Sequence, residues 1–581
     1  MAVLGIDVGG TFTDAVLLAD GRLATAKVPT SGRQEEAVVA AARKVGAGEL
    51  ERFTHGTTVA TNALLERKGA RTAFVGTRGF EHLLHLRRQD RAHLYRLCAD
   101  HPEPLVPLER CYGVRERAGP AGVLEDLDLG TLEEFEAEAV AVCLLFSFRD
   151  PEHERLVAEE VRTRLPQAHV VASHEISPEF REYERASTTA IDAYLGPVLA
   201  RYLGALTGAC GAAGLPEPLV MRSSGGVTTL AEAAAHPALV LVSGPAAGAV
   251  GAAEIARRAG IEGAISFDMG GTSTDVCLIA GGEAGRVGER AVGGLPLRLP
   301  TVDLHTVGAG GGSVVWRDSG GALRVGPESA GAEPGPACYG RGGTRPTVTD
   351  ANLLLGRLPE RLAGGLELDR EAAERALAGI DPAAVIEAVN AEMLGALRVV
   401  SVERGLDPRD FALVAFGGAG PLHACALAEE LGIGRVLVPA AAGVLSALGL
   451  AASDERRDRV ESHVRPLAEV EMAALPSEGE ADLRYRGQSF ELTVPLGGDL
   501  AEAFHRAHEE RYGYADRGRA VELVVVRTAE VCPGPRLDLP AGEPLDVTGP
   551  TVLELEGATC WIPPGWVGVR DGNSTLILTR A

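Results

Sequence analysis

The sequence predicts an α/β fold in which two related halves precede a smaller β-rich portion. Three observations predict it: strand-like apolar runs alternate with helical patterns, one glycine-rich peptide occurs twice, and the glycine motifs stop near residue 455. The runs at 139–148 and 169–173 are typical of strands, and 177–196 is typical of a helix interrupted at Pro197. Such alternation of strands and helices is characteristic of α/β proteins.

The repeated peptide is GIDVGGTFTD at 5–14 and SFDMGGTSTD at 266–275. In each copy a strand ends in Asp, and a Gly-Gly turn leaves backbone N–H groups open to a phosphate because no Cβ stands in the way. Asp7 and Asp268 are the predicted catalytic residues and would hold Mg²⁺ or Mn²⁺ directly or through water. The predicted phosphate-binding residues are Gly9, Gly10, Thr11, Phe12, Thr13, Gly270, Gly271, Thr272, Ser273 and Thr274.

A second aspartate ends each copy of the repeat, Asp14 in the first and Asp275 in the second. We expect these two carboxylates to accept hydrogen bonds from turn N–H groups and so to hold the hairpin, rather than to act in catalysis. A plain glycine hairpin is the alternative interpretation of one copy. Two copies with matched Asp, Thr and Asp favour two phosphate-binding turns.

Composition excludes several classes of protein. The chain has 581 residues, which is too long for one core, and a net charge of −24, which repels nucleic-acid backbones. Three lysines occur, none in a glycine-rich turn, and GxxxxGK[ST] is absent, so a Walker-type NTPase is excluded.

Cysteine usage and hydropathy predict a cytoplasmic protein. Nine dispersed cysteines without a CxxC pair favour reduced thiols. The N-terminus predicts no signal peptide, because a strand begins at once with no basic region before it. The apolar stretch at 436–453 is rich in Ala and Gly, which favours a packed buried segment over a membrane span.

A third glycine-rich element, GGAGPLHA at 417–424, lies between a predicted strand and a predicted helix. Its glycines Gly417, Gly418 and Gly420 leave room for a base or ribose and are the predicted adenosine-binding residues. Two phosphate hairpins followed by this element form the layout of the actin/Hsp70/sugar-kinase ATPase fold, in which two ribonuclease H-like domains close over one nucleotide. The predicted domains are 1–185, 186–455 and 456–581.

Two segments rich in small residues, SGPAAGAVGAA at 243–253 and AAAGVLSALGLAA at 440–452, are predicted to be crossing helices. Small side chains let helix backbones approach closely. We expect this crossing to be the hinge on which the two domains close.

Seven motifs, which follow one another along the chain, make its resemblance to one protein family specific. They are IDVGGTFTD, HGTTVATNALLERKGA (55–70), REYERASTTAIDAYL (181–195), SGPAAGAVGA, FDMGGTSTDV, HTVGAGGGS (305–313) and FGGAGPLHA. Over roughly 1–455 the chain resembles the hydantoinase A/5-oxoprolinase family, which includes acetone carboxylase subunits. The resemblance implies an ATP-dependent enzyme that phosphorylates the carbonyl oxygen of a cyclic amide such as a hydantoin or 5-oxoproline, or of a ketone such as acetone.

The resemblance also implies a hydantoinase B-type partner subunit that completes hydrolysis or carboxylation. No remaining segment is long enough to be that subunit, so we expect a separate partner and an oligomer. Two alternatives stay open on the sequence: a small-molecule kinase of the same fold, and a non-catalytic ATP-switched binding protein.

Two further groups of residues have open roles. By the family resemblance, His55, Thr57, Thr58 and Asn62 face the substrate or a phosphate, and the alternative is a loop that caps a helix. Asp303 and His305 alternate on one predicted strand and could ligate a second divalent metal. A buried Asp–His hydrogen bond is the equal alternative for that pair.

Overall fold

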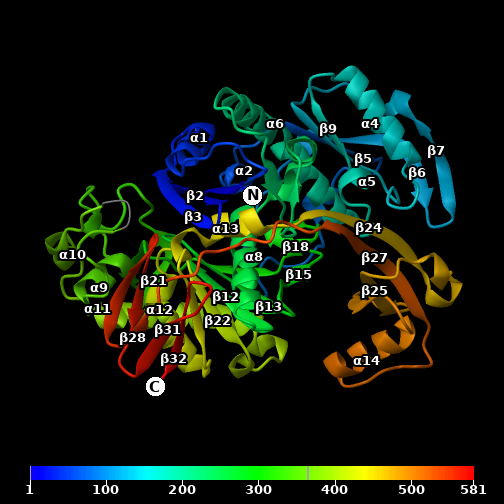
Figure 1. Ribbon diagram of the computed structural model, residues 1–581. Coiled ribbons are helices and arrows are strands. Elements are labelled where there is room, and N and C mark those ends of the chain that lie inside the picture. Colours follow the sequence, from blue (N-terminus) through cyan, green and yellow to red (C-terminus); the bar gives the residue numbers. More distant parts are fainter. Residues whose placement is uncertain (1, 363–365) are drawn as a thin grey trace.

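The computed structural model describes residues 2–362 and 366–581. Its first half is built on a ten-stranded sheet with the order β26-β25-β27-β24-β11-β10-β4-β1-β2-β3 (Figure 1). The strands nearest the first copy of the repeat are β1 (Ala2–Val8), β2 (Phe12–Ala19), β3 (Arg22–Pro29), β4 (Arg52–Thr57), β10 (Leu219–Met221) and β11 (Val227–Thr228). β1 pairs antiparallel with β2 and parallel with β4, and α1 (Gln34–Lys44) packs against β1 and β3.

The second half is built on a sheet with the order β14-β13-β12-β22-β23-β32-β31-β28, to which β19 adds beside β13. Its strands are β12 (Gly263–Met269), β13 (Thr274–Ala280), β14 (Glu283–Ala284), β19 (Leu304–Val307), β22 (Ala412–Phe416), β23 (Val436–Pro439), β28 (Asp546–Thr548), β31 (Trp566–Arg570) and β32 (Thr575–Arg580). β12 pairs antiparallel with β13 and parallel with β22, as β1 does with β2 and β4. The common pairing pattern confirms the predicted duplication.

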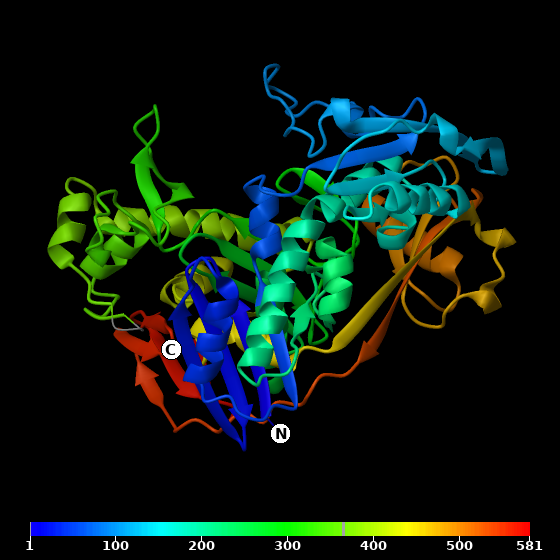
Figure 2. The ribbon, with the colours of Figure 1, turned by 90° about the horizontal axis from the view of Figure 1, so that it is seen from above.

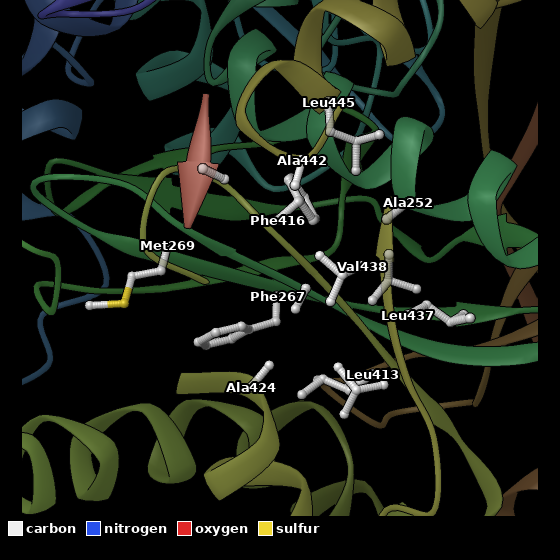
Figure 3. Close-up of a cluster of buried hydrophobic side chains, with 14 of the residues drawn as sticks. Ala252, Phe267, Met269, Leu413, Phe416, Ala424, Leu437, Val438, Ala442 and Leu445 are labelled. Atoms are coloured by element: carbon white, nitrogen blue, oxygen red, sulfur yellow. The ribbon is translucent and has the colours of Figure 1, made fainter. Parts of the chain in front are cut away.

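The core of the second half lies between this sheet and α12 (Gly420–Leu431). Figure 3 shows Phe267 of β12, Leu413 of β22 and Val438 of β23 near one another on the side of the sheet that α12 covers, with Ala424 of α12 below. All four side chains are buried. The apolar strand residues that precede each glycine turn therefore anchor it, because they are packed between sheet and helix.

Two glycine- and alanine-rich helices cross at the centre of the molecule, α8 (Ser243–Arg258) and α13 (Leu445–Ala452) (Figure 1). A Cβ on Gly449 would lie 2.0 Å from the Ala247 carbonyl oxygen, and a Cβ on Gly251 would lie 2.8 Å from the Leu445 carbonyl oxygen. Larger side chains would separate the helices. The predicted crossing is confirmed, and its action as a hinge stays a prediction.

A five-stranded sheet, β7-β6-β5-β8-β9, forms a separate lobe inserted between β4 and β10, visible beyond the long helix α6 in Figure 2. Its strands are β5 (Thr72–Thr77), β6 (Cys111–Gly119), β7 (Gly122–Asp128), β8 (Ala139–Cys143) and β9 (His169–Ala172). The helix expected at 177–196 is α6 (Glu182–Ala212), which continues through Pro197. Burial of its first half outweighs the hydrogen bond lost at proline.

The remaining elements connect these parts. They are α2 (Val59–Leu65), α3 (Leu83–Leu86), α4 (Glu152–Arg164), α5 (Ser173–Ile176), α7 (Leu230–Ala235), α9 (Val348–Leu354), α10 (Arg370–Ala376), α11 (Pro382–Val400), β15 (Arg286–Val287), β16 (Arg290–Val292), β17 (Leu295–Leu297), β18 (Thr301–Val302), β20 (Ser313–Arg317) and β21 (Leu323–Ser329). Within the described residues, no helix is long and apolar enough to cross a membrane.

The segment predicted as one C-terminal domain, 456–581, is β-rich and occupies two places (Figure 1). The module drawn in orange extends the first sheet; it contains β24 (Glu455–Pro466), β25 (Glu480–Tyr485), β26 (Leu492–Pro495), α14 (Leu500–Tyr512) and β27 (Val521–Cys532). The chain then returns, and β28, β31 and β32 extend the second sheet. Between β28 and β31 in the sequence lies the hairpin of β29 (Thr551–Leu555) and β30 (Ala558–Ile562).

Candidate functional site

A cavity of about 1600 Å³ lies between the two halves, with the two copies of the repeat on its wall. The predicted site residues that line it are Asp7, Gly9, Gly10, Thr11, Phe12, Asp268, Gly270, Gly271, Thr272, Ser273, Gly417 and Gly418. Peptides far apart in the sequence therefore meet at one site.

The two glycine turns have the same local geometry. The Gly9 N–H donates to the Phe12 carbonyl at 3.0 Å, and the Gly270 N–H donates to the Ser273 carbonyl at 3.1 Å. A Cβ added to the second glycine of either turn, Gly10 or Gly271, would meet no atom within 4 Å. Each turn therefore presents bare backbone to the cavity, which is what approach by a phosphate requires.

The glycine-rich segment 310–312 holds the second turn in place through backbone hydrogen bonds. Gly311 N–H donates to the Gly270 carbonyl at 3.0 Å, and Gly312 N–H donates to the Gly271 carbonyl at 2.7 Å. A Cβ on Gly310 would lie 2.6 Å from the Thr272 nitrogen. Close backbone packing explains why the sequence is glycine-dense here.

The catalytic candidates Asp7 and Asp268 are the last residues but one of strands β1 and β12. One carboxylate oxygen of Asp7, Oδ1, is buried without a hydrogen-bond partner. Burial, with the charge of Asp14, raises the pKa of Asp7 to about 7. Burial, with the charge of Asp275 and then of Asp7, raises the pKa of Asp268 to about 8.

This arrangement suits a bound cation. Close packing confines both carboxylates, since a Cβ on Gly56 would lie 2.5 Å from Asp7 Oδ1 and a Cβ on Gly417 would lie 2.2 Å from Asp268 Oδ1. Unpartnered carboxylate oxygens are the ligands that Mg²⁺ prefers. Across the described residues, no preformed group of three or more His, Cys, Asp or Glu ligands exists. A metal here would therefore take its other ligands from water or phosphate.

Lys27 lies in the cavity, and the sequence reasoning missed it. It stands on β3 opposite Asp14, and its Nζ donates to both Asp14 oxygens at 2.6 and 2.8 Å. Nζ also lies 5.2 Å from the centre of the Phe12 ring. The available signal was hairpin pairing: β3 follows β2 through the tight turn at Asp20-Gly21, which sets Lys27 opposite Asp14.

Asp14 and Asp275 both line the cavity and both serve the hairpins, although their partners differ from those predicted. Asp14 accepts from Lys27, and Asp275 accepts from the Thr306 hydroxyl at 2.5 Å. The expected turn N–H groups are not these donors. The neighbouring strand supplies a side chain instead, because each aspartate faces across the sheet rather than back into its turn.

The second threonines of the repeat do not reach the cavity. Thr13 and Thr274 are fully buried; the Thr13 hydroxyl lies 3.0 Å from the Thr30 hydroxyl, and the Thr274 hydroxyl donates to the Ala309 carbonyl at 2.5 Å. Their predicted phosphate role is corrected to a structural one. Successive strand residues face opposite sides of the sheet, and these two face the interior.

The predicted adenosine loop contributes two of its three glycines. Gly417, with φ +78°, and Gly418 line the cavity. Gly420 instead begins α12 and is buried, where a Cβ would lie 3.3 Å from the Phe267 carbonyl oxygen. It therefore packs helix against strand, and its predicted contact with adenosine is corrected.

The predicted substrate-facing group does not line the cavity. His55 is fully buried between the Ile6 carbonyl, at 3.1 Å, and the Tyr202 hydroxyl, at 2.8 Å, and burial lowers its pKa to about 4. The Thr57 carbonyl accepts from the Ser243 hydroxyl at the start of α8. These contacts fit the alternative reading, in which the loop holds helices.

Thr58 and Asn62, the other members of that group, are half-buried at the start of α2. The Thr58 hydroxyl is buried without a hydrogen-bond partner. The second predicted metal pair is also not assembled: Asp303 forms an ion pair with Arg404, and His305 stands on β19 opposite Val276. The salt bridge occupies the carboxylate that a metal would need.

Comparisons with known proteins show which family the chain resembles. The family model described as hydantoinase/oxoprolinase N-terminal region matches residues 3–165, and the model described as hydantoinase/oxoprolinase matches residues 185–459. Caprolactamase subunit alpha of Pseudomonas jessenii is 33% identical, over 99% of each chain. Acetophenone carboxylase gamma subunit of Aromatoleum aromaticum is 35% identical, over 78% of this chain and 68% of that one.

5-Oxoprolinase 1 of Arabidopsis thaliana is 33% identical over 79% of this chain, which spans only 42% of that protein's length. Among solved structures, ATP-dependent caprolactamase from Pseudomonas jessenii is 30% identical with a TM-score of 0.87, over 100% of both chains. Nucleotide-free acetone carboxylase is 25% identical with a TM-score of 0.79, also over 100% of both chains.

Proposed function

The chain belongs to the hydantoinase/oxoprolinase family, and we propose that it uses ATP to phosphorylate the carbonyl oxygen of a cyclic amide for hydrolysis. The observation that carries the proposal is the pair of bare glycine turns on one cavity, each beside a half-buried aspartate, Asp7 or Asp268. The lactam-acting relatives support a hydantoin, N-methylhydantoin or 5-oxoproline-like lactam as the substrate class.

The chemistry follows from the low reactivity of amides. In the proposed step the carbonyl oxygen attacks the γ-phosphorus of ATP, a new O–P bond forms, the bond from phosphorus to the β–γ bridging oxygen breaks, and ADP leaves. Water then adds to the activated carbon, the ring C–N bond breaks, nitrogen takes a proton, and an acyl phosphate remains. A second water adds to the acyl carbon, the bond from that carbon to the phosphate oxygen breaks, and a carboxylate and inorganic phosphate are released. Phosphoryl transfer needs positioning and charge neutralisation rather than covalent help.

Residues of this chain have separate tasks in that step. The turns at Gly9-Gly10 and Gly270-Gly271 hold the phosphates from two sides, and Lys27 adds the positive charge that the turns lack. Asp7 and Asp268 would hold Mg²⁺ or Mn²⁺, which would neutralise phosphate oxygens as phosphoryl transfer proceeds.

A second chain completes the reaction in this proposal. The related proteins named as subunits support a multi-subunit assembly. We propose a hydantoinase B-type partner that directs water to the activated carbon, and a cytoplasmic location, which the nine unpaired cysteines of the chain support.

The test is a screen for ADP release with hydantoin, N-methylhydantoin, 5-oxoproline, caprolactam and acetone, each with and without the partner. We expect one cyclic amide to stimulate ATP turnover. Stimulation by ketones alone would favour the second candidate, ketone phosphorylation for carboxylation, which the acetophenone and acetone carboxylase relatives support. ATP turnover that no carbonyl compound stimulates would contradict both.

A further inference from the structure

The hairpin of β29 and β30 forms one wall of the cavity, although it lies about 130 residues after GGAGPLHA, the last glycine motif. Its cavity-lining residues are Glu554, Leu555, Glu556, Gly557, Ala558 and Thr559. The base of the hairpin belongs to the second half, since Ala558, Cys560 and Ile562 are part of that hydrophobic core. Trp561 adds a cation–π contact with Arg357, whose guanidinium lies 5.6 Å from the ring.

The tip of the hairpin contacts both halves of the molecule. On the first half, the Thr25 hydroxyl of β3 donates to Glu556 Oε1 at 2.5 Å. On the second half, the Gly443 N–H donates to the Glu556 carbonyl at 3.1 Å. Backbones are in close contact there, because a Cβ on Gly443 would lie 2.2 Å from the Gly557 carbonyl carbon. The tip is therefore held in a fixed place beside the cavity.

The hairpin faces the end of the cavity formed by the Gly417-Gly418 loop. A Cβ on Gly418 would lie 3.9 Å from the Gly557 carbonyl oxygen, and β30 packs against α12, which follows that loop. Glu554 and Thr559 are directly opposed across the hairpin, so their side chains share one face. Both line the cavity.

The charge of this wall decides which part of a nucleotide it suits. A carboxylate repels phosphate oxygens, whereas it accepts hydrogen bonds from the hydroxyls of a ribose or the amino group of a base. Glu554 is exposed to the cavity, and the Thr559 hydroxyl adds a second polar group. The glycine turns suit the phosphates, and the Glu554–Thr559 face of this wall suits the nucleoside.

We propose that the β29–β30 hairpin binds the nucleoside end of the nucleotide, with Glu554 and Thr559 as its polar contacts. The proposal rests on the proposed use of ATP. It gives the C-terminal segment a role in nucleotide recognition: selection of a nucleoside triphosphate over a simple polyphosphate.

The experiment is calorimetric titration of the full chain with two probes in the presence of Mg²⁺: a non-hydrolysable ATP analogue and inorganic tripolyphosphate. The variants are Glu554→Gln, which keeps the shape but removes the charge and replaces one acceptor oxygen by an NH2 donor, and Thr559→Val, which keeps the shape and removes the hydroxyl. Each should bind the ATP analogue about tenfold more weakly, since a lost polar contact is worth about 1.4 kcal/mol. Affinity for tripolyphosphate should not change. The matched control is Asp546→Asn on β28, an exposed carboxylate outside the cavity.

The outcomes separate the hairpin proposal from the proposed function. Wild-type affinity for the ATP analogue in both variants, or equal weakening of both probes, would overturn the hairpin proposal alone. A change in KM for the cyclic amide without a change in nucleotide affinity would also overturn it. A wild-type chain that binds neither probe would contradict the use of ATP, and the hairpin proposal with it.

Discussion

The two glycine hairpins have nearly the same sequence and the same backbone, yet they differ in charge. In both, a strand-end aspartate is paired across the hairpin with the second aspartate, Asp7 with Asp14 and Asp268 with Asp275. The difference comes from the strand that pairs with each hairpin. On the first hairpin, β3 supplies the ammonium of Lys27 to Asp14. On the second, β19 supplies the hydroxyl of Thr306 to Asp275.

This difference sets the electrostatics of the cavity. Lys27 lowers the pKa of Asp7, against the effects of burial and of Asp14, so that the pKa is about 7. Lys27 lowers the pKa of Asp268 as well, but burial and the three carboxylates Asp275, Asp7 and Asp14 raise it, and the pKa is about 8. The repeat thus determines the geometry of the two turns, and the side chains around it determine their charge.

Asp268→Asn and Asp7→Asn test the claim that both hairpins are needed. Each should reduce ATP turnover by about 10²-fold or more, because the metal and its charge neutralisation are lost. The measurement is steady-state ADP release, with Asp546→Asn as the matched control. Wild-type turnover in either variant would show that the corresponding hairpin is not part of the reaction site.

Gly248→Leu tests whether the halves must move relative to each other. A Cβ on Gly248 would lie 2.9 Å from the Phe416 ring and 3.2 Å from Ser446 Oγ. Overpacking should destabilise the fold by about 1–3 kcal/mol and should slow turnover if closure pivots here. Gly204→Leu is the control, since Gly204 has open space around its Cβ position. Unchanged ATP affinity and turnover in the Gly248 variant would count against the hinge.

Lys27→Met removes the ammonium that pairs with Asp14 on the first hairpin. Affinity for ATP should fall about tenfold, because a cation beside the phosphates is lost. Thr306→Val is the comparison on the other hairpin, where only a neutral donor is lost, and its effect should be smaller. The measurement is titration with the non-hydrolysable analogue. Equal effects of the two variants would show that the two hairpins do not differ in their electrostatic contribution to nucleotide binding.

The raised pKa of Asp268 also predicts how stability depends on pH. The folded-state pKa of Asp268 is about 8, against an ordinary 3.8, so the folded state binds more protons than the unfolded state between these values. Stability of the unliganded chain should therefore fall as pH rises from about 4 to about 8. Asp268→Asn should flatten this dependence in thermal melts. A variant with the wild-type pH profile would contradict the assigned pKa.

The smallest effects are expected at the buried threonines. Thr13→Val and Thr274→Val each remove one buried hydrogen bond and should destabilise the fold by about 1 kcal/mol. Nucleotide affinity should be unchanged, because neither hydroxyl lines the cavity. Chemical denaturation and titration measure the two quantities. Weaker nucleotide binding without loss of stability would restore the phosphate role that the sequence suggested.

The candidate site residues were predictable from the sequence where they lie together in one short peptide. Asp7, Asp268 and the glycine turns follow from the repeat itself, since local sequence determines a strand, a turn and the residues on them. Lys27 was not predictable in this way, because its position depends on the pairing of β3 with β2. The prediction for Thr13 and Thr274 was wrong because side chains alternate between the two faces of a strand, and the repeat alone does not show which face each threonine occupies.

The fold shows the same limit. The duplicated sheets and the α8–α13 crossing follow from local patterns of glycine and apolar residues. The division of 456–581 between two sheets depends on pairings with strands more than 100 residues earlier, such as β32 with β23. The domain boundaries drawn from sequence stay predictions.

The central claim is that the carbonyl oxygen of the substrate receives the γ-phosphoryl group. The direct measurement uses a cyclic amide whose carbonyl oxygen carries a heavy isotope, incubated with ATP, this chain and its partner. Mass spectrometry of the released inorganic phosphate should show the heavy oxygen, because the O–P bond formed by attack survives hydrolysis at carbon. Phosphate without the label, released together with the hydrolysed product, would contradict the account.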